Sequence, residues 1–189
     1  MNLSSTSTLG RGVVYETRIP LTWKPLKVLP EPSQLLSLND HNETVLRTVL
    51  SLEEIGSEHS EEGGGSNQEL VRIEAKVNLV LNLVGQLLAT QSTIPAKVAA
   101  VLSATSLEWS GGKLPADGQP LLLEIYLHPS YPRPLRLVGT TQSGSDPEGM
   151  TCRVTFQGLS EPVQDVLEKL IFRHHRRAIA QARASRDTH

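Results

Sequence analysis

The chain has 189 residues, of which 38% are apolar and 20% charged, with a formal net charge of −2. These values exclude a charge-rich disordered chain and a membrane protein, and they allow one ordinary domain with added elements. The longest apolar run, residues 77–89, is shorter than the roughly 20 residues of a membrane-spanning helix. No signal peptide is recognisable. We therefore expect a cytoplasmic protein.

The N-terminal third predicts one strand and one helix. Residues 1–14 are Ser/Thr-rich and are expected to be flexible, and alternation over residues 15–23 predicts an edge strand broken or bent at Pro20. Three prolines then end it, so residues 15–38 form a strand and its connection. Asn39 or Asp40 can cap the helix that follows, which ends at Gly56. Its apolar stripe consists of Val45, Val49 and Leu52, with Leu46 and Leu50 beside it.

A second helix follows a linker. Residues 56–66 combine three consecutive glycines with acids and serines, which predicts a flexible connection. Beyond it, apolar residues recur at a 3-4-3-4-3 spacing at Leu70, Ile73, Val77, Val80, Val84 and Leu87. This stripe predicts either an intramolecular hairpin with the preceding helix or an intermolecular bundle. Periodicity alone favours neither.

In the remaining half of the chain, apolar residues alternate with polar ones, a period of two that is typical of β-strands. Strands are predicted at residues 98–104, 107–109, 119–127, 135–142 and 150–157. Leu121, Leu123, Ile125 and Leu127 are expected to face the core, as are Cys152, Val154 and Phe156. Short strands with Gly and Pro turns indicate a barrel or a sandwich. Ser160 caps a terminal helix whose apolar stripe is Val163, Leu167, Leu170, Ile171 and His174.

No pattern of catalytic or metal-ligating residues is present. The sequence has no Gly-x-Ser-x-Gly turn, no phosphate-binding Gly-x-x-x-x-Gly-Lys loop and no Cys or His pair with metal-ligand spacing. The lone Cys152 lies in a predicted strand, where a buried unreactive thiol is expected. We predict no catalytic residue, no metal and no cofactor.

Two surface segments are candidates for partner contact. The Pro-rich loop 128–134 carries Tyr131 and Arg133, although it also fits a merely rigid connection. The terminal helix carries Arg173, Arg176 and Arg177, which can contact a partner or form a solvated helix end favoured by the helix dipole. Residues 53–69 are acidic whereas residues 173–186 are basic, so these two segments are predicted to attract different partners.

The order of these elements resembles that of the atypical, tetrameric PilZ domain proteins. The resemblance lies in the helix 72–88, in Leu102-Ser-Ala-Thr-Ser-Leu-Glu-Trp109, in Phe156-Gln-Gly-Leu-Ser160 and in Phe172-Arg-His-His-Arg-Arg177. It implies an α+β fold with a six-stranded β-barrel over residues 91–159, and a C-terminal helix and basic tail over 160–189. It also implies an oligomerisation hairpin of two long inserted helices over residues 39–90, whose heptads assemble four copies.

PilZ domains act in cyclic di-GMP signalling, and their standard binding signature is degenerate in this chain. The signature joins an Arg-x-x-x-Arg arm ahead of the barrel to an Asp/Asn-x-Ser-x-x-Gly strand. Here Ala104 stands in the acidic place and Trp109 in the Gly place, so Ser106 alone is retained. The one Arg-x-x-x-Arg, Arg173 to Arg177, lies inside the terminal helix. The resemblance therefore implies that standard nucleotide binding is lost.

Together these features predict a non-enzymatic, oligomeric adaptor in bacterial cyclic di-GMP signalling. Its expected partners are its own copies, in a homotetramer through the helices, and a further protein. The alternative is a cyclic di-GMP receptor that uses a non-standard site. Nucleic acid is a third possibility, supported by the arginine-rich terminus alone. No membrane association is predicted.

Overall fold

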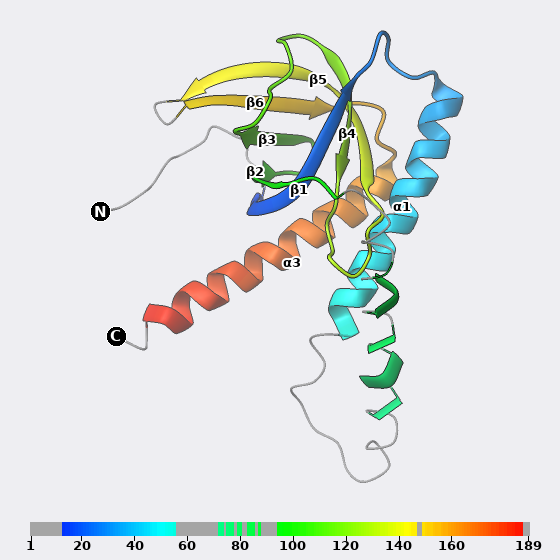
Figure 1. Cartoon of the computed structure of the whole chain (residues 1–189), viewed down its shortest axis with the longest axis vertical. Helices are drawn as coiled ribbons and strands as arrows, with labels where there is room; N and C mark the ends of the chain where they lie inside the picture. Colours follow the sequence, from blue (N-terminus) through cyan, green and yellow to red (C-terminus); the bar gives the residue numbers. More distant parts are fainter. Residues whose placement is uncertain are drawn as a thin grey trace.

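Six strands form a closed barrel, and two long helices pack at one end of it (Figure 1). The computed structural model describes residues 13–55, 72–73, 75–77, 79–80, 83–85, 87, 94–146 and 149–186. The elements are β1 (Tyr15–Pro25), α1 (Pro32–Ile55), β2 (Lys97–Leu102), β3 (Ser106–Ser110), β4 (Pro120–Ile125), β5 (Leu135–Asp146), β6 (Gly149–Phe156) and α3 (Glu161–Arg186). The expected N-terminal flexibility, the linker 56–66 and Leu70 fall outside these residues.

The strands are antiparallel in the order β1-β2-β3-β6-β5-β4, and β1 closes the ring. The expectation that β1 is an edge strand is wrong. Residues 15–20 pair with β2, whereas residues 21–25 pair with β4. Pro20 lies where the partner changes, and its carbonyl accepts a hydrogen bond from the Tyr126 N–H. Pro20 is tolerated because a strand that changes partner does not need every N–H for one ladder.

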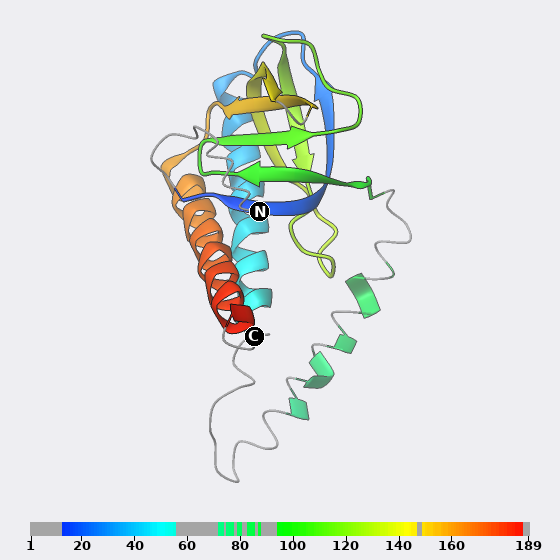
Figure 2. The same cartoon turned by 90° about the vertical axis from the view of Figure 1, so that its left-hand side faces the viewer.

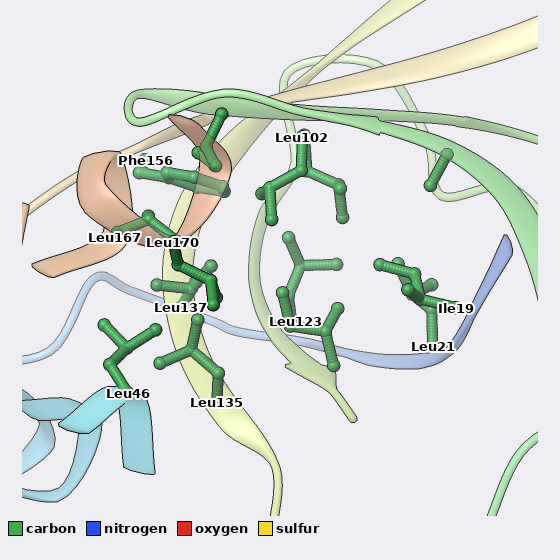
Figure 3. Close-up of a cluster of buried hydrophobic side chains, with 14 of the residues drawn as sticks. Ile19, Leu21, Leu46, Leu102, Leu123, Leu135, Leu137, Phe156, Leu167 and Leu170 are labelled. Atoms are coloured by element: carbon green, nitrogen blue, oxygen red, sulfur yellow. The ribbon is translucent and has the colours of Figure 1, made fainter. Parts of the chain in front are cut away.

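The α+β fold class and the barrel are confirmed, and the sandwich is excluded. Each predicted strand is present, with β5 extending four residues further than expected. Leu121, Leu123 and Ile125 are buried, as are Cys152, Val154 and Phe156, whereas Leu127 is only half-buried. Leu46 of α1 and Leu167 and Leu170 of α3 point toward Leu135 and Leu137 of β5 (Figure 3). One apolar core therefore joins the barrel to both helices.

Helix α1 begins at Pro32, seven residues before the predicted cap at Asn39. The Gln34 side-chain oxygen accepts a hydrogen bond from the Glu31 N–H, which satisfies a donor ahead of the first turn. Pro32 occupies the first helical position, where its missing N–H is not needed. The connection after β1 is therefore shorter than predicted, because its last seven residues belong to the helix.

Asn39 and Asn42, placed near the expected cap, instead attach α1 to the barrel. The Asn39 side chain donates to the Gly158 carbonyl and accepts from the Ser160 N–H, and it thereby contacts the start of α3. The Asn42 side chain donates to the Arg136 carbonyl and accepts from the Arg136 N–H, as a neighbouring strand would. Both asparagines are buried, so these bonds fix the position of α1 along β5.

The apolar stripe of α1 packs inside its own chain. Val45, Leu46, Val49 and Leu50 belong to the core cluster, and α1 contacts α3 and β5. Because Val45, Leu46, Val49 and Leu50 are buried in their own chain, they are not available to pack against other copies. A contribution of α1 to an oligomerisation hairpin over residues 39–90 stays a prediction. The intramolecular hairpin with the second helix is not what the described residues show. Figure 2 shows the helical pieces of residues 72–87 away from α3.

Candidate functional site: a groove, a helix clamp and an exposed helical stripe

A cavity of about 910 Å³ lies between the β2–β3 turn and α3. We call it the β2–β3 groove. Its walls are Ser103, Ala104, Thr105 and Ser106 of the turn, Gln142, Arg153 and Thr155 of β5 and β6, Val13, and Asp165, Glu168, Lys169, Ile171 and Phe172 of α3. The groove contains two of the three residues of the degenerate motif, Ala104 and Ser106. Its volume lies within the range of ligand pockets, about 300–1,000 Å³.

The hydroxyl of Ser106, the retained residue of the signature, is hydrogen-bonded within the β2–β3 turn. The Ser106 and Ser103 hydroxyls lie 2.9 Å apart, and the Ser103 hydroxyl donates to the Ser106 carbonyl at 3.1 Å. The Ser103 oxygen also accepts from the N–H groups of Thr105 and Ser106. Both serines are buried. The hydroxyl that would bind a base edge in the standard signature here stabilises a tight turn.

The other motif positions do not offer a nucleotide-binding edge. Trp109 is 2% exposed and belongs to the core cluster, so the position that standard domains give to Gly is filled by a large side chain. The side chain of Ala104 has no hydrogen-bonding group. Trp109 is thus a core residue.

The charges in the groove are balanced rather than basic. The Arg153 guanidinium donates to the Glu108 carboxylate at 2.9 Å and 2.6 Å, across the β3–β6 pair. Lys169 is the other groove cation, and it stands beside Asp165 and Glu168 on α3. A dianionic ligand would meet as many carboxylates as cations here, so the groove has little electrostatic attraction for it.

A cluster of ion pairs joins the C-terminal end of α1 to α3, and we call it the helix clamp. The Arg173 guanidinium donates to the Leu50 carbonyl and the Glu54 carboxylate. Glu53 pairs with His174 at 2.8 Å and with Arg177 at 3.3 Å. The acidic residues Glu53 and Glu54 and the basic helix therefore bind each other. The prediction that these two segments attract different partners is wrong for these residues.

The clamp shifts the pKa values of its carboxylates. Burial alone would raise the pKa of Glu53, but the hydrogen bond from His174 and the charges of His174, Arg177 and Arg173 outweigh it and leave the pKa below its ordinary value of 4.5. The hydrogen bond and charge of Arg173 lower the pKa of Glu54. Burial lowers the pKa of His128, although the charge of Glu53 opposes this. Both carboxylates are thus held in the ionised form.

The predicted partner-contact residues are placed in different environments. Arg173 and Arg177 belong to the clamp, whereas Arg176 is exposed and lies 5.9 Å from the centre of the Phe172 ring. In the loop 128–134, Arg133 is exposed and Tyr131 is half-buried against the core. The structure does not bring these five residues into one surface. Partner contact through Arg133 and Arg176 stays a prediction.

The helical pieces of residues 72–87 expose the apolar stripe. Ile73, Val77, Val80, Val84 and Leu87 are 47–60% exposed, and Leu79 and Leu83 are 59% and 55% exposed. Their helical conformation agrees with the prediction, and Leu70 lies outside the described residues. Seven exposed large apolar side chains on one short segment exceed what scattered surface residues explain.

Gly85 lies where a helical piece of this segment contacts the barrel's own loop. Gly85 is buried, and a Cβ atom placed on it would lie 2.4 Å from the Ser130 carbonyl oxygen. With 3.6 residues per turn, Gly85 lies about 120° around the helix from the middle of the apolar stripe. The contact with the loop therefore leaves the stripe exposed.

Sequence reasoning missed the groove and the clamp. The acidic residues of α1 and the basic residues of α3 were visible, but they are more than 100 residues apart and only the fold places them together. The wall residues Asp165, Glu168 and Lys169 have the ordinary composition of an exposed helix face.

Among the described residues, no helix is long and apolar enough to cross a membrane.

Comparison with known proteins identifies the fold family. A family model described as an atypical PilZ domain, cyclic di-GMP receptor, matches residues 46–184. A solved structure from Xanthomonas campestris, described as a new tetrameric PilZ domain self-assembled via an unusual helical bundle, is similar in fold, with a TM-score of 0.70 and 24% identity. The match covers 91% of this chain and 93% of that one. No curated protein matched the sequence. The family model spans well over half of the sequence, and the chain therefore belongs to the atypical PilZ domain family.

Proposed function

We propose that the protein is a non-enzymatic, self-assembling adaptor in bacterial cyclic di-GMP signalling. The observation that carries this proposal is the exposed apolar stripe of residues 73–87. Five residues at heptad spacing are about half exposed in the single chain, and their burial between copies would be favourable. The apolar stripe of α1 is already buried, so the 73–87 helix provides the contact.

A homotetramer fits this stripe best. Leu79 and Leu83 lie beside the heptad positions, and they widen the apolar surface beyond a two-stranded seam. Each helix therefore has apolar surface for more than one neighbour. The similar Xanthomonas protein is described as tetrameric through a helical bundle. Four barrels held on one bundle would present the same surface four times, which raises avidity for a multivalent partner.

The β2–β3 turn supports the loss of standard nucleotide binding. Ser106 is held by Ser103, Trp109 fills the core, and Arg153 is neutralised by Glu108. The groove therefore lacks a free guanidinium pair to grip two phosphates. The adaptor acts through its assembly and its protein contacts.

A second candidate function is a cyclic di-GMP receptor with a non-standard site. The family description as a cyclic di-GMP receptor favours this candidate. In this case the groove would bind the nucleotide through Lys169 and Arg153, after Arg153 leaves Glu108. Arg153→Glu would then abolish binding.

Light scattering and titration calorimetry test both candidates. The adaptor predicts a tetramer whose mass is unchanged by cyclic di-GMP, with no heat of binding. Val77→Asp with Val84→Asp should give a folded monomer, because charges in the stripe oppose its burial. Leu36→Asp is the matched control, since Leu36 is an exposed apolar residue on α1 outside the stripe, and its tetramer should persist. A monomeric wild type contradicts the adaptor, and saturable binding lost in Arg153→Glu establishes the receptor.

A further inference from the structure

One face of α3 is exposed from the first turn of the helix almost to its end. We call it the α3 face, and in chain order its side chains are Glu161, Asp165, Glu168, Phe172, Arg176, Ile179 and Arg183. All of them are exposed, and the two apolar ones, Phe172 and Ile179, are 51% and 40% exposed. At about 100° per residue these side chains lie within an arc of about 80°, opposite the buried Val163, Leu167 and Leu170.

The charges of the α3 face are ordered symmetrically around Phe172. The three acidic residues lie 11, 7 and 4 residues before it, whereas Arg176, Ile179 and Arg183 follow it at 4, 7 and 11 residues. The first half of the face is therefore acidic and the second half is mainly basic. A surface with this order is complementary to itself when a second copy lies antiparallel to it, as in a two-fold contact.

Antiparallel pairing about Phe172 places opposite charges against each other. Glu168 then faces Arg176 of the second copy, and Glu161 faces Arg183 of that copy. The two Phe172 rings meet at the two-fold axis. A parallel pair would instead place each acidic side chain against itself and each arginine against itself, which is unfavourable.

The α3 face also forms one wall of the β2–β3 groove. Asp165, Glu168 and Phe172 line the groove, together with Val13, which is 42% exposed. Helix α3 extends beyond the barrel (Figure 1), so its C-terminal half is accessible to a second copy. In the antiparallel pair, Ile179 of that copy lies opposite Asp165 and covers apolar surface at this wall.

We propose that the α3 faces of two copies pack antiparallel across a two-fold axis and cover the β2–β3 groove of each copy. From Glu161 to Arg183 the contact is about 33 Å long. It has fewer residues than the roughly 20–30 a side of a standard interface. The contact therefore rests on the proposed self-assembly through residues 73–87, which raises the effective concentration of one α3 face for another.

Disulfide trapping at the two-fold axis tests the contact. Packed helices lie about 8–10 Å apart, so Phe172→Cys brings two thiols within disulfide reach. We expect these chains to form covalent dimers on oxidation with copper phenanthroline. The native Cys152 is buried and its pKa is raised to about 11, first by burial and then by the charges of Asp117 and Glu108, so it does not interfere at neutral pH.

The matched control is Ile179→Cys on the same face. In the antiparallel pair, the two copies of this residue are separated by about 21 Å along the helix axes, so it should form covalent dimers at least about tenfold more slowly than Phe172→Cys. Equal rates at the two positions would indicate a parallel pair or random collision and would overturn the proposal.

A charge exchange tests the facing residues. Adding Glu168→Arg to the Phe172→Cys chain places two positive charges together, and we expect about tenfold slower cross-linking. Adding Arg176→Glu as well should restore the original rate, because opposite charges face each other again. Failure of this rescue in chains that circular dichroism shows to be folded would overturn the pairing.

Light scattering on the same samples before oxidation separates this inference from the proposed function. A tetramer that forms no covalent dimer at Phe172→Cys overturns the α3 contact and leaves the adaptor standing. A monomer that still cross-links with the charge dependence above overturns the adaptor alone. A monomer without covalent dimers overturns both.

Discussion

The helices α1 and 72–87 carry similar apolar repeats but bury them differently. Val45, Leu46 and Val49 of α1 are at most 1% exposed, whereas Val77, Val80 and Val84 are about half exposed. Apolar spacing therefore predicts that a helix packs against something, but it does not specify the neighbour. For α1, the neighbour is the chain's own barrel, and its polar residues hydrogen-bond to that barrel.

Polar anchors decide the outcome for α1. Asn39, Asn42 and His41 hydrogen-bond to backbone groups of the barrel and of the α3 start, and the clamp holds the other end. The helix 72–87 meets its barrel through Gly85, where only a hydrogen atom fits against Ser130. Among the described residues, α1 combines these polar contacts with a buried apolar stripe, whereas the helical pieces of residues 72–87 combine the Gly85 contact with an exposed one.

The largest expected effect comes from truncating the α1 stripe. Leu46→Ala removes a side chain with no exposed surface and should lower the free energy of unfolding by about 2–5 kcal/mol. Leu83→Ala on the exposed helix is the matched control. It should weaken assembly in light scattering, while urea unfolding at protein concentrations below assembly shows a change within about 0.5 kcal/mol. Equal losses of stability in Leu46→Ala and Leu83→Ala would show that both side chains are buried in the core of the same chain.

The next effect concerns the anchor at Asn42. Asn42→Ala leaves the Arg136 N–H and carbonyl without their side-chain partner, which should cost about 1–3 kcal/mol in urea unfolding. Asp40→Ala, at an exposed neighbouring position, should change stability by less than about 0.5 kcal/mol. If Asn42→Ala leaves the urea midpoint of unfolding unchanged, apolar packing alone positions α1.

The clamp predicts a pH dependence. The pKa of Glu53 is lowered in the folded chain, so its contribution is fully present above the ordinary value of 4.5 and is lost as pH falls through the folded pKa. Glu53→Gln should lower stability by about 1 kcal/mol at neutral pH and flatten the decline below pH 4.5. Glu43→Gln, in the surface pair with Arg47, should keep the native profile. Parallel acid profiles for Glu53→Gln and the native chain would contradict a stabilising clamp.

The smallest effect on stability is expected at Gly85. The methyl group of Gly85→Ala has no room against the Ser130 carbonyl, so the helix and the loop must separate. We expect a loss below about 1 kcal/mol, because the contact is local, with faster amide exchange in residues 128–134. The mass of the assembly should not change, since the apolar stripe lies on another face. An unaltered rate of amide exchange in residues 128–134 would show that the contact between Gly85 and Ser130 does not stabilise the loop.

Much of the fold followed from local patterns, and much of the site did not. Alternation predicted each of the six strands and most of their buried faces, because one side of every strand faces the barrel core. The start of α1 was missed because three nearby prolines predict an irregular connection, whereas Pro32 is the first residue of the helix. The groove and the clamp join residues from distant parts of the chain, and no local spacing records such neighbours.

By itself the sequence determined the elements, the apolar faces and the degenerate motif at Ala104, Ser106 and Trp109, because these depend on residue type and short-range period. Only the tertiary structure decided that β1 closes the barrel, that Glu53 and Glu54 bind Arg173 and Arg177, and that the α1 stripe is buried while residues 73–87 are exposed. Burial and ion pairing depend on which distant segments lie side by side, and the closed barrel with its two packed helices determines those neighbours.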